Sequence, residues 1–80
     1  MTSTELMSQE ILRLSRATRH SAFINTRRLS DFYHVPEKSV RREMAKLADE
    51  KRIRLKGELT GDAFVDKAPE GMSVRVDLIE

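Results

Sequence analysis

Apolar residues recur at helical spacing in the N-terminal part of the chain. Residues 5–19 carry the stripe Leu6, Ile11, Leu14 and Ala17, flanked by Met7 and Leu12. This spacing predicts a first helix. Thr2 stands three residues before Glu5, an arrangement that favours a capping box at the start of that helix.

Two further helices are expected before residue 51. Residues 27–33 predict a short helix that begins after Thr26, a good N-cap residue, and buries Leu29, Phe32 and Tyr33. Pro36 then separates this helix from the next, since proline is tolerated at the first turn of a helix and not inside one. Residues 37–51 predict a third helix, because Val40, Met44 and Leu47 fall on one face.

After Lys51 the hydrophobic period changes from helical to two. Ile53, Leu55 and Leu59 alternate with charged residues, and residues 73–79 repeat this alternation with Val74, Val76 and Leu78. Both stretches predict strands with one buried face. Between them we expect a turn at 60–62, a short strand at 63–65 and a loop at 66–71, and Phe23-Ile24 suffices only for a stub of strand. The expected fold is α+β, three helices followed by a small antiparallel sheet, in one domain spanning 1–80.

The charge is distributed unevenly although the net charge is only +2. Residues 13–56 hold 13 Lys/Arg and 5 Asp/Glu, whereas residues 57–80 hold 2 and 6. The basic block indicates a polyanionic partner. The chain has no cysteine, no apolar run long enough for a membrane span and no signal-like N-terminus, so we expect a cytoplasmic protein without disulfides or membrane contact.

The segment 26–47 resembles a helix-turn-helix. Its apolar residues have the spacing that locks two helices across a short turn, which leaves the start of the second helix free to enter the DNA major groove. With the strand at 52–57 the pattern is similar to winged helix-turn-helix domains, most of all to GntR- and DeoR-type regulators, with 35–42 the closest part. His34 occupies the turn position where that family usually has glycine. The resemblance implies a helix-turn-helix at 26–51, a wing and sheet at 52–79, and transcription regulation by sequence-specific binding of double-stranded DNA.

The residues expected to contact DNA follow from this resemblance and from the basic block. On and just before the third helix they are Pro36, Glu37, Lys38, Ser39, Arg41, Arg42 and Lys46. Arginine binds guanine or phosphate, and a helix N-terminus binds phosphate, which adds Thr26, Arg27 and Arg28 from the second helix and Arg54 from the first wing strand. The wing region itself is acidic (Glu58, Asp62, Asp66, Glu70), so we do not expect its tip to approach phosphates.

Other functions have less support in the sequence. No phosphate loop, nucleophile–histidine pair or metal-ligand spacing occurs, so we expect no enzyme activity, no cofactor and no metal, with His20 and His34 structural or at the surface. The alternative function is a winged helix that docks a protein, in a bacterial, phage or plasmid setting, through a strand edge at residues 74–79. The same strand, or the ends of the first helix, would serve a homodimer matched to a palindromic operator.

Overall fold

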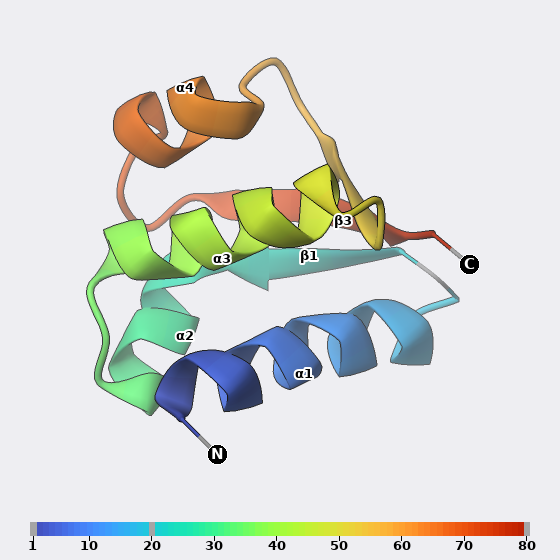
Figure 1. Cartoon of the computed structure of the whole chain (residues 1–80), viewed down its shortest axis with the longest axis horizontal. Coiled ribbons are helices and arrows are strands. Elements are labelled where there is room, and N and C mark those ends of the chain that lie inside the picture. The colour runs from blue at the N-terminus through green and yellow to red at the C-terminus, as the bar shows by residue number, and fades with distance from the viewer. Residues whose placement is uncertain (1, 20, 80) are drawn as a thin grey trace.

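Four helices and a three-stranded antiparallel sheet make up the part of the chain that the computed structural model describes, residues 2–19 and 21–79. In chain order the elements are α1 (Ser3–Ala17), β1 (Ser21–Asn25), α2 (Thr26–Tyr33), α3 (Glu37–Asp49), β2 (Ile53–Lys56), α4 (Gly61–Lys67) and β3 (Ser73–Leu78) (Figure 1). The fold is therefore α+β as predicted. The prediction of three helices that all precede the sheet is wrong, because β1 lies between α1 and α2 and α4 lies between β2 and β3.

The start of α1 agrees with the sequence, but its buried face does not. Thr2 is the N-cap, and its hydroxyl accepts a hydrogen bond from the Glu5 N–H at 3.1 Å. The buried residues of α1 are Met7, Ile11, Leu12 and Ser15. Leu6, which the predicted stripe placed inside, is 43% exposed. The face of α1 that meets the core therefore differs from the predicted stripe and includes Ser15. The Ser15 hydroxyl is buried without loss of a partner, because it donates to the Ile11 carbonyl at 2.9 Å.

The junction of β1 and α2 corrects two expectations. Residues 21–25 form a full strand paired with β3, where the sequence supported only a stub. The N-cap of α2 is Asn25, whose side chain accepts a hydrogen bond from the Arg28 N–H. Thr26, the expected cap, is instead the first residue of the helix and is fully buried, with its N–H and hydroxyl directed to the Met72 carbonyl.

The turn between α2 and α3 is built as the sequence indicated. His34 ends α2 in the left-handed conformation, at φ 55° and ψ 45°. The N–H groups of His34 and Val35 both reach the Ser30 carbonyl, and the Ser30 hydroxyl donates to the Val35 carbonyl. Pro36 is the N-cap of α3. Three residues therefore join the two helices and fix their angle.

The sheet has the order β1-β3-β2, so the last strand in the chain is the central one. β3 pairs with β1 from Ser21↔Asp77 to Asn25↔Ser73, and with β2 from Ile53↔Leu78 to Lys56↔Arg75. The expectation that this strand offers an exposed edge to a partner chain or a second copy is wrong, because both of its edges are already paired. The free edges belong to β1 and β2.

α4 occupies the segment for which a turn, a short strand and a loop were expected. It buries Phe64, Val65 and, just beyond its end, Ala68. Phe64 and Ala68 are four residues apart and lie on one helical face, packed against α3. Asp62 in the first turn and Lys67 in the last turn complement the helix dipole. The connection between β2 and β3 therefore contains a helix.

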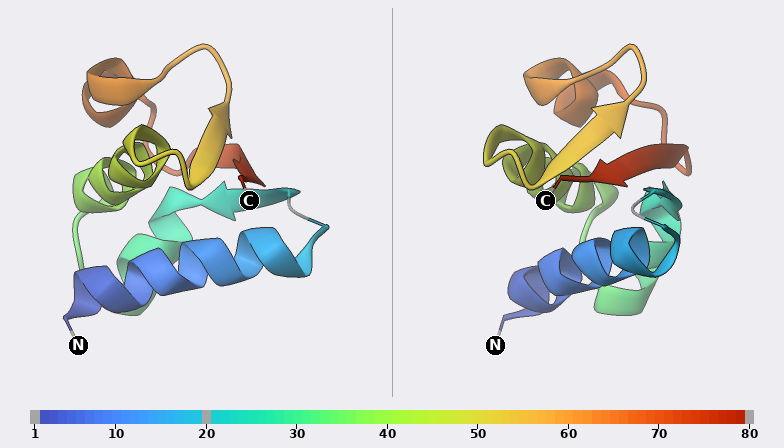
Figure 2. Two further views of the ribbon diagram at one scale, coloured as in Figure 1. Left: turned by 45° about the vertical axis from the view of Figure 1, so that its right-hand side comes forward. Right: turned by 90° about the vertical axis from the view of Figure 1, so that its right-hand side faces the viewer.

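One core holds all these elements together. The inward side chains of the sheet, among them Ile24, Val76 and Ile53, pack against Ile11 of α1 and Met44 of α3. α1 and α3 lie on the same side of the sheet, and α4 lies along α3 (Figure 2). None of the helices in the described ranges is both long and apolar enough to cross a bilayer.

Candidate nucleic-acid interface

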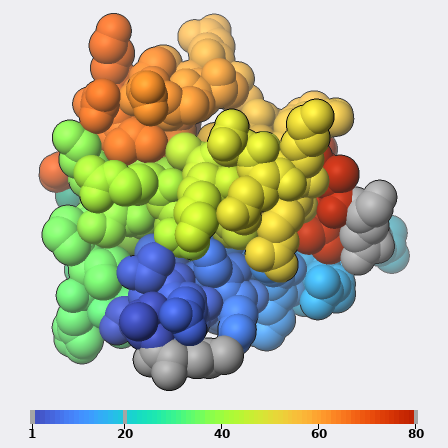
Figure 3. Space-filling model, viewed as in Figure 1, coloured from blue at the N-terminus to red at the C-terminus, as the bar shows by residue number. Residues whose placement is uncertain are grey.

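A basic stripe runs along the exposed side of α3. Lys38, Arg42 and Lys46 are spaced four residues apart, so they lie one above the other on one face, and all three are exposed. Ser39 lies half-buried beside them, and exposed Pro36 precedes them at the N-cap. We call Lys38, Arg42 and Lys46 the α3 stripe. Figure 3 shows α3 across the middle of the molecule, between α4 and α1, with its outer side open.

Arg41 does not belong to this stripe. It was expected on the exposed face, but it is only 7% exposed. Its Nε donates to the Val65 carbonyl of α4 at 3.0 Å. Its Nη1 lies 3.8 Å from Glu37 Oε2. The guanidinium is thus used inside the protein, where it joins α3 to α4. The sequence showed no sign of this because α4 itself was not predicted.

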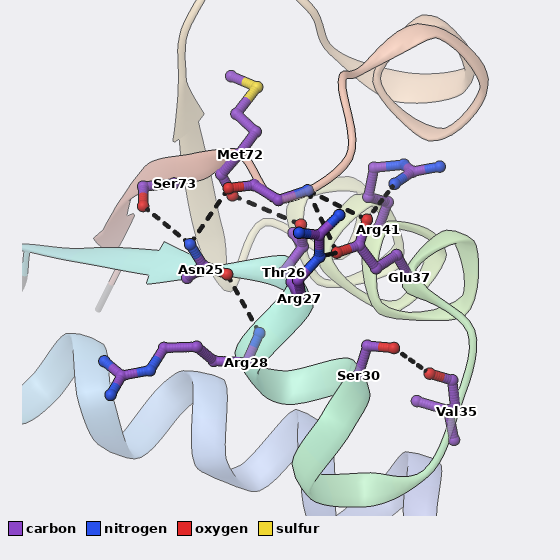
Figure 4. Close-up of polar contacts among 11 residues, drawn as sticks. Asn25, Thr26, Arg27, Arg28, Ser30, Val35, Glu37, Arg41, Met72 and Ser73 are labelled. Carbon is purple, nitrogen blue, oxygen red and sulfur yellow. Dashed lines mark hydrogen bonds and ion pairs between the residues drawn. The ribbon is translucent and has the colours of Figure 1, made fainter.

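Glu37 is the second internal residue among the expected DNA contacts. Its side chain is 10% exposed, and its two carboxylate oxygens accept hydrogen bonds from the Gly71 N–H at 3.1 and 3.2 Å. Gly71 has φ 72°, a conformation that favours glycine. Arg27 Nε lies 3.4 Å from the same carboxylate (Figure 4). Glu37 therefore connects the loop before β3 to both α2 and α3.

The remaining basic candidates lie on other parts of the surface. Arg27 and Arg28 are exposed at the start of α2. The Arg27 side chain turns toward Glu37, whereas that of Arg28 extends away from this cluster (Figure 4). Arg54 alternates with buried Ile53 and Leu55, so it projects from the outer face of the sheet. The structure thus brings together only the α3 stripe, Ser39 and Pro36 on one face.

Acidic residues of α4 border the α3 stripe. Asp66 Oδ1 lies 3.3 Å from Lys38 Nζ, with both side chains more than half exposed. Such an exposed ion pair contributes little stability and leaves Lys38 available to a phosphate. Asp62 shares a shallow groove of about 380 Å³ with Arg42 and Lys46. The side of the stripe that faces α4 is therefore acidic. Carboxylates are present toward α1 as well, since Glu5, Glu43 and Glu50 line a groove there together with Lys46 and Arg52.

A second charged group lies where α1 meets α2. Arg13 donates from Nε and Nη2 to the two Glu10 oxygens at 2.5 and 2.9 Å, and this hydrogen bonding lowers the pKa of Glu10. Burial raises the pKa of Tyr33, and the negative charge of Glu10 raises it further. The Tyr33 ring meets Phe32 edge to face, with centroids 4.8 Å apart. This group contains none of the expected DNA contacts.

The histidines and acidic side chains do not gather into a metal centre in the described ranges 2–19 and 21–79, where no cluster of three or more suitable ligands occurs. His34 is at the surface, and His20 lies outside the described residues. No family profile, curated protein or solved structure matches this chain.

The sequence did not predict Asn25 as the N-cap of α2 or the position of Asp62 and Asp66 beside α3. Asn25 is as good an N-cap residue as Thr26 and stands directly before it, so the sequence alone did not separate the two. The aspartates were noticed as acidic, but their position beside α3 depends on α4. The spacing of Phe64, Val65 and Ala68 was the available signal for that helix.

Proposed function

We propose that this protein is a winged helix-turn-helix domain that binds double-stranded DNA by inserting α3 into the major groove. The α3 stripe is the observation that carries the proposal. A helix fits the major groove, and lysine and arginine on its outer side reach base edges and phosphates. The three-residue turn and the buried inner face of α3 hold that stripe in a fixed direction. The resemblance of residues 35–42 to GntR- and DeoR-type regulators supports a role in transcription regulation.

The contact set follows from the exposure of each side chain. Arg42 and Lys38 are the candidates for base edges near the start of α3, and Lys46 and Ser39 are the candidates for phosphates. Glu37 and Arg41 act inside the protein, where they hold α3 and α4 in place. Because α4 is acidic, we propose that it stays out of the minor groove and that the domain contacts DNA through the helix-turn-helix alone.

A mobility-shift experiment with a salt series tests this function. The probe is a pool of random-sequence duplexes, and sequencing of the retained fraction gives the site. We expect binding at low salt. The logarithm of the association constant should fall linearly with the logarithm of the salt concentration. Arg42→Ala combined with Lys46→Ala should weaken binding at the selected site by about 1–3 kcal/mol for the base contact of Arg42 and reduce the salt slope by about 1 for the phosphate contact of Lys46.

The control is a variant with the same loss of charge on another face. Lys56→Ala combined with Arg75→Ala removes two cations from the outer face of the sheet and should leave the selected site and most of the affinity unchanged. Absence of duplex binding at low salt, or equal losses in the two double variants, would contradict the proposal. Circular dichroism of each variant separates a loss of contact from a loss of folding.

A further inference from the structure

The outer face of the sheet is open and carries its side chains in three rows, the third of which holds Asn25 and Ser73. Strand register places Phe23 opposite Arg75, and Arg75 opposite Lys56. The neighbouring row holds Ser21, Asp77 and Arg54. In the described part of the chain α1 and α3 pack on the other side of the sheet, so no helix covers these rows (Figure 2).

Phe23 stands out on this face because its ring is 76% exposed. The alternation of β1 directs Ala22 and Ile24 into the core and Phe23 outward, so the ring is presented by a rigid strand. A shallow groove of about 300 Å³ beside Phe23 is lined by Asn25, Ser73 and Arg28 of α2 and by the apolar side chains of Leu14, Ile24 and Leu29. The face therefore offers an exposed aromatic ring next to a groove with both polar and apolar walls.

The charges around Phe23 are mostly positive. Among the described residues of the three strands, Arg54, Lys56 and Arg75 share a single carboxylate on this face, that of Asp77. Lys56 Nζ and Arg75 Nε lie 3.9 and 3.8 Å from its oxygens. One carboxylate does not neutralise three cations, and Arg28 adds another cation where it lines the groove. The face is thus complementary to an anionic chain.

We propose that this outer face binds single-stranded nucleic acid, with a base stacked on Phe23 and phosphates on Lys56, Arg75 and Arg28. An aromatic ring flanked by cations on a rigid surface is the arrangement that takes up unpaired bases and their backbone together. In a duplex the bases are already stacked on one another, so the Phe23 ring has no base to contact. This surface is separate from the α3 stripe, which lies on the opposite side of the sheet, and the proposal does not depend on duplex binding.

Fluorescence anisotropy with labelled oligo-dT and oligo-U of about 12 nucleotides tests the proposal. We expect both to bind at low salt. Phe23→Ala should weaken binding about 5- to 100-fold, the range for loss of one stacked base, and Phe23→Trp should restore it.

Lys56→Ala with Arg75→Ala should reduce the salt slope by about 0.7 for each residue. Asp77→Asn should strengthen binding because it removes the one carboxylate among the cations.

Phe32→Ala is the matched control, since Phe32 is 75% exposed on α2 and does not lie on the sheet. It should leave oligonucleotide affinity unchanged, as should Arg42→Ala with Lys46→Ala. Failure of the oligonucleotides to bind overturns the proposal. Oligonucleotide binding that Phe23→Ala leaves intact also overturns it. The same holds if poly-glutamate displaces the oligonucleotide equally well from the wild type and from Phe23→Ala, because the face would then attract any polyanion, an acidic protein segment included.

Discussion

His34 ends α2 in a backbone conformation that a residue with a side chain adopts at a cost. The left-handed region is disfavoured by about 1–2 kcal/mol for L-residues, while glycine enters it freely but loses more entropy on folding, about 0.5–1 kcal/mol. His34→Gly should therefore raise the free energy of unfolding by about 0.5–1 kcal/mol, measured by urea denaturation.

Two further substitutions at this residue isolate the backbone effect. His34→Asn should be near neutral, because asparagine tolerates this conformation, whereas His34→Val should destabilise the protein. A glycine variant less stable than the wild type would show that the imidazole contributes an interaction of its own.

Tyr33 is the single tyrosine of the chain, so its ionisation is directly visible in the ultraviolet spectrum. Burial and the charge of Glu10 raise the pKa of Tyr33 in the folded protein. As pH rises, the unfolded chain therefore loses this proton first. The contribution of Tyr33 to the free energy of unfolding is present at pH values below its pKa in the unfolded chain. It is lost as the pH rises through its pKa in the folded protein. We expect tyrosinate to appear at higher pH in the native protein than in denaturant.

Substitutions of the neighbouring charged residues provide controls for the Tyr33 titration. Glu10→Gln should bring the native pKa of Tyr33 closer to the denatured value, and Arg13→Ala should move it further away, because Arg13 lowers that pKa. A native titration that coincides with the denatured one would show that the Tyr33 ring is open to solvent.

At the scale of elements, the contact between α3 and α4 depends on the buried pair of Glu37 and Arg41. Glu37→Gln removes the charge that faces Arg41 and weakens acceptance from the Gly71 N–H. Because one partner of a buried pair is left uncompensated, we expect a loss of about 3 kcal/mol in the free energy of unfolding, measured by chemical denaturation.

A compensating variant checks this explanation. Glu37→Gln combined with Arg41→Met removes both charges and fills the same space with an apolar side chain, so it should recover much of the lost stability. If the double variant were as unstable as the single one, the hydrogen bonds to Gly71 and Val65 would account for the effect rather than the uncompensated charge.

The elements that the sequence predicted well are those with a long periodic pattern. α3 follows from Val40, Met44 and Leu47, and β3 follows from strict alternation at 73–78. The short elements were harder to predict. Ala63-Phe64-Val65 fits a strand or one turn of helix equally, and only packing on α3 decides in favour of the helix. β1 is only five residues long, too short for a periodic pattern to identify it, and β3 pairs with it over its whole length.

At the scale of the whole molecule, the candidate site was predictable only where it depended on one helix. Lys38, Arg42 and Lys46 are on one face of α3 by spacing alone. The helical period also placed Arg41 toward solvent, and it is buried because a segment more than 20 residues later folds over it. The exposure of Phe23 depends in the same way on the register of β1 against β3. Contacts between distant segments are the part that local pattern does not contain.

The net charge of +2 thus conceals an ordered distribution over the folded surface. Cations occupy the α3 stripe on one side and the outer sheet face on the other. The carboxylates of α4 border the first, and Asp77 is the described carboxylate that lies within the second. The paired double variants described above test both faces in one set of proteins, and the expected pattern is a reciprocal loss, of duplex binding in one variant and of single-strand binding in the other.

The central position of β3 has a consequence for how the protein folds during its synthesis. During synthesis α1, α2 and α3 emerge from the ribosome early, but β1 and β2 have no strand to pair with until residues 73–78 follow. Until then the apolar inner sides of both strands stay uncovered, and such surfaces are prone to aggregate. The pairing of β1 with β3 joins residues about 50 positions apart, and long-range pairing of this kind slows folding. The sheet therefore closes in a late step, when its last strand enters between the other two.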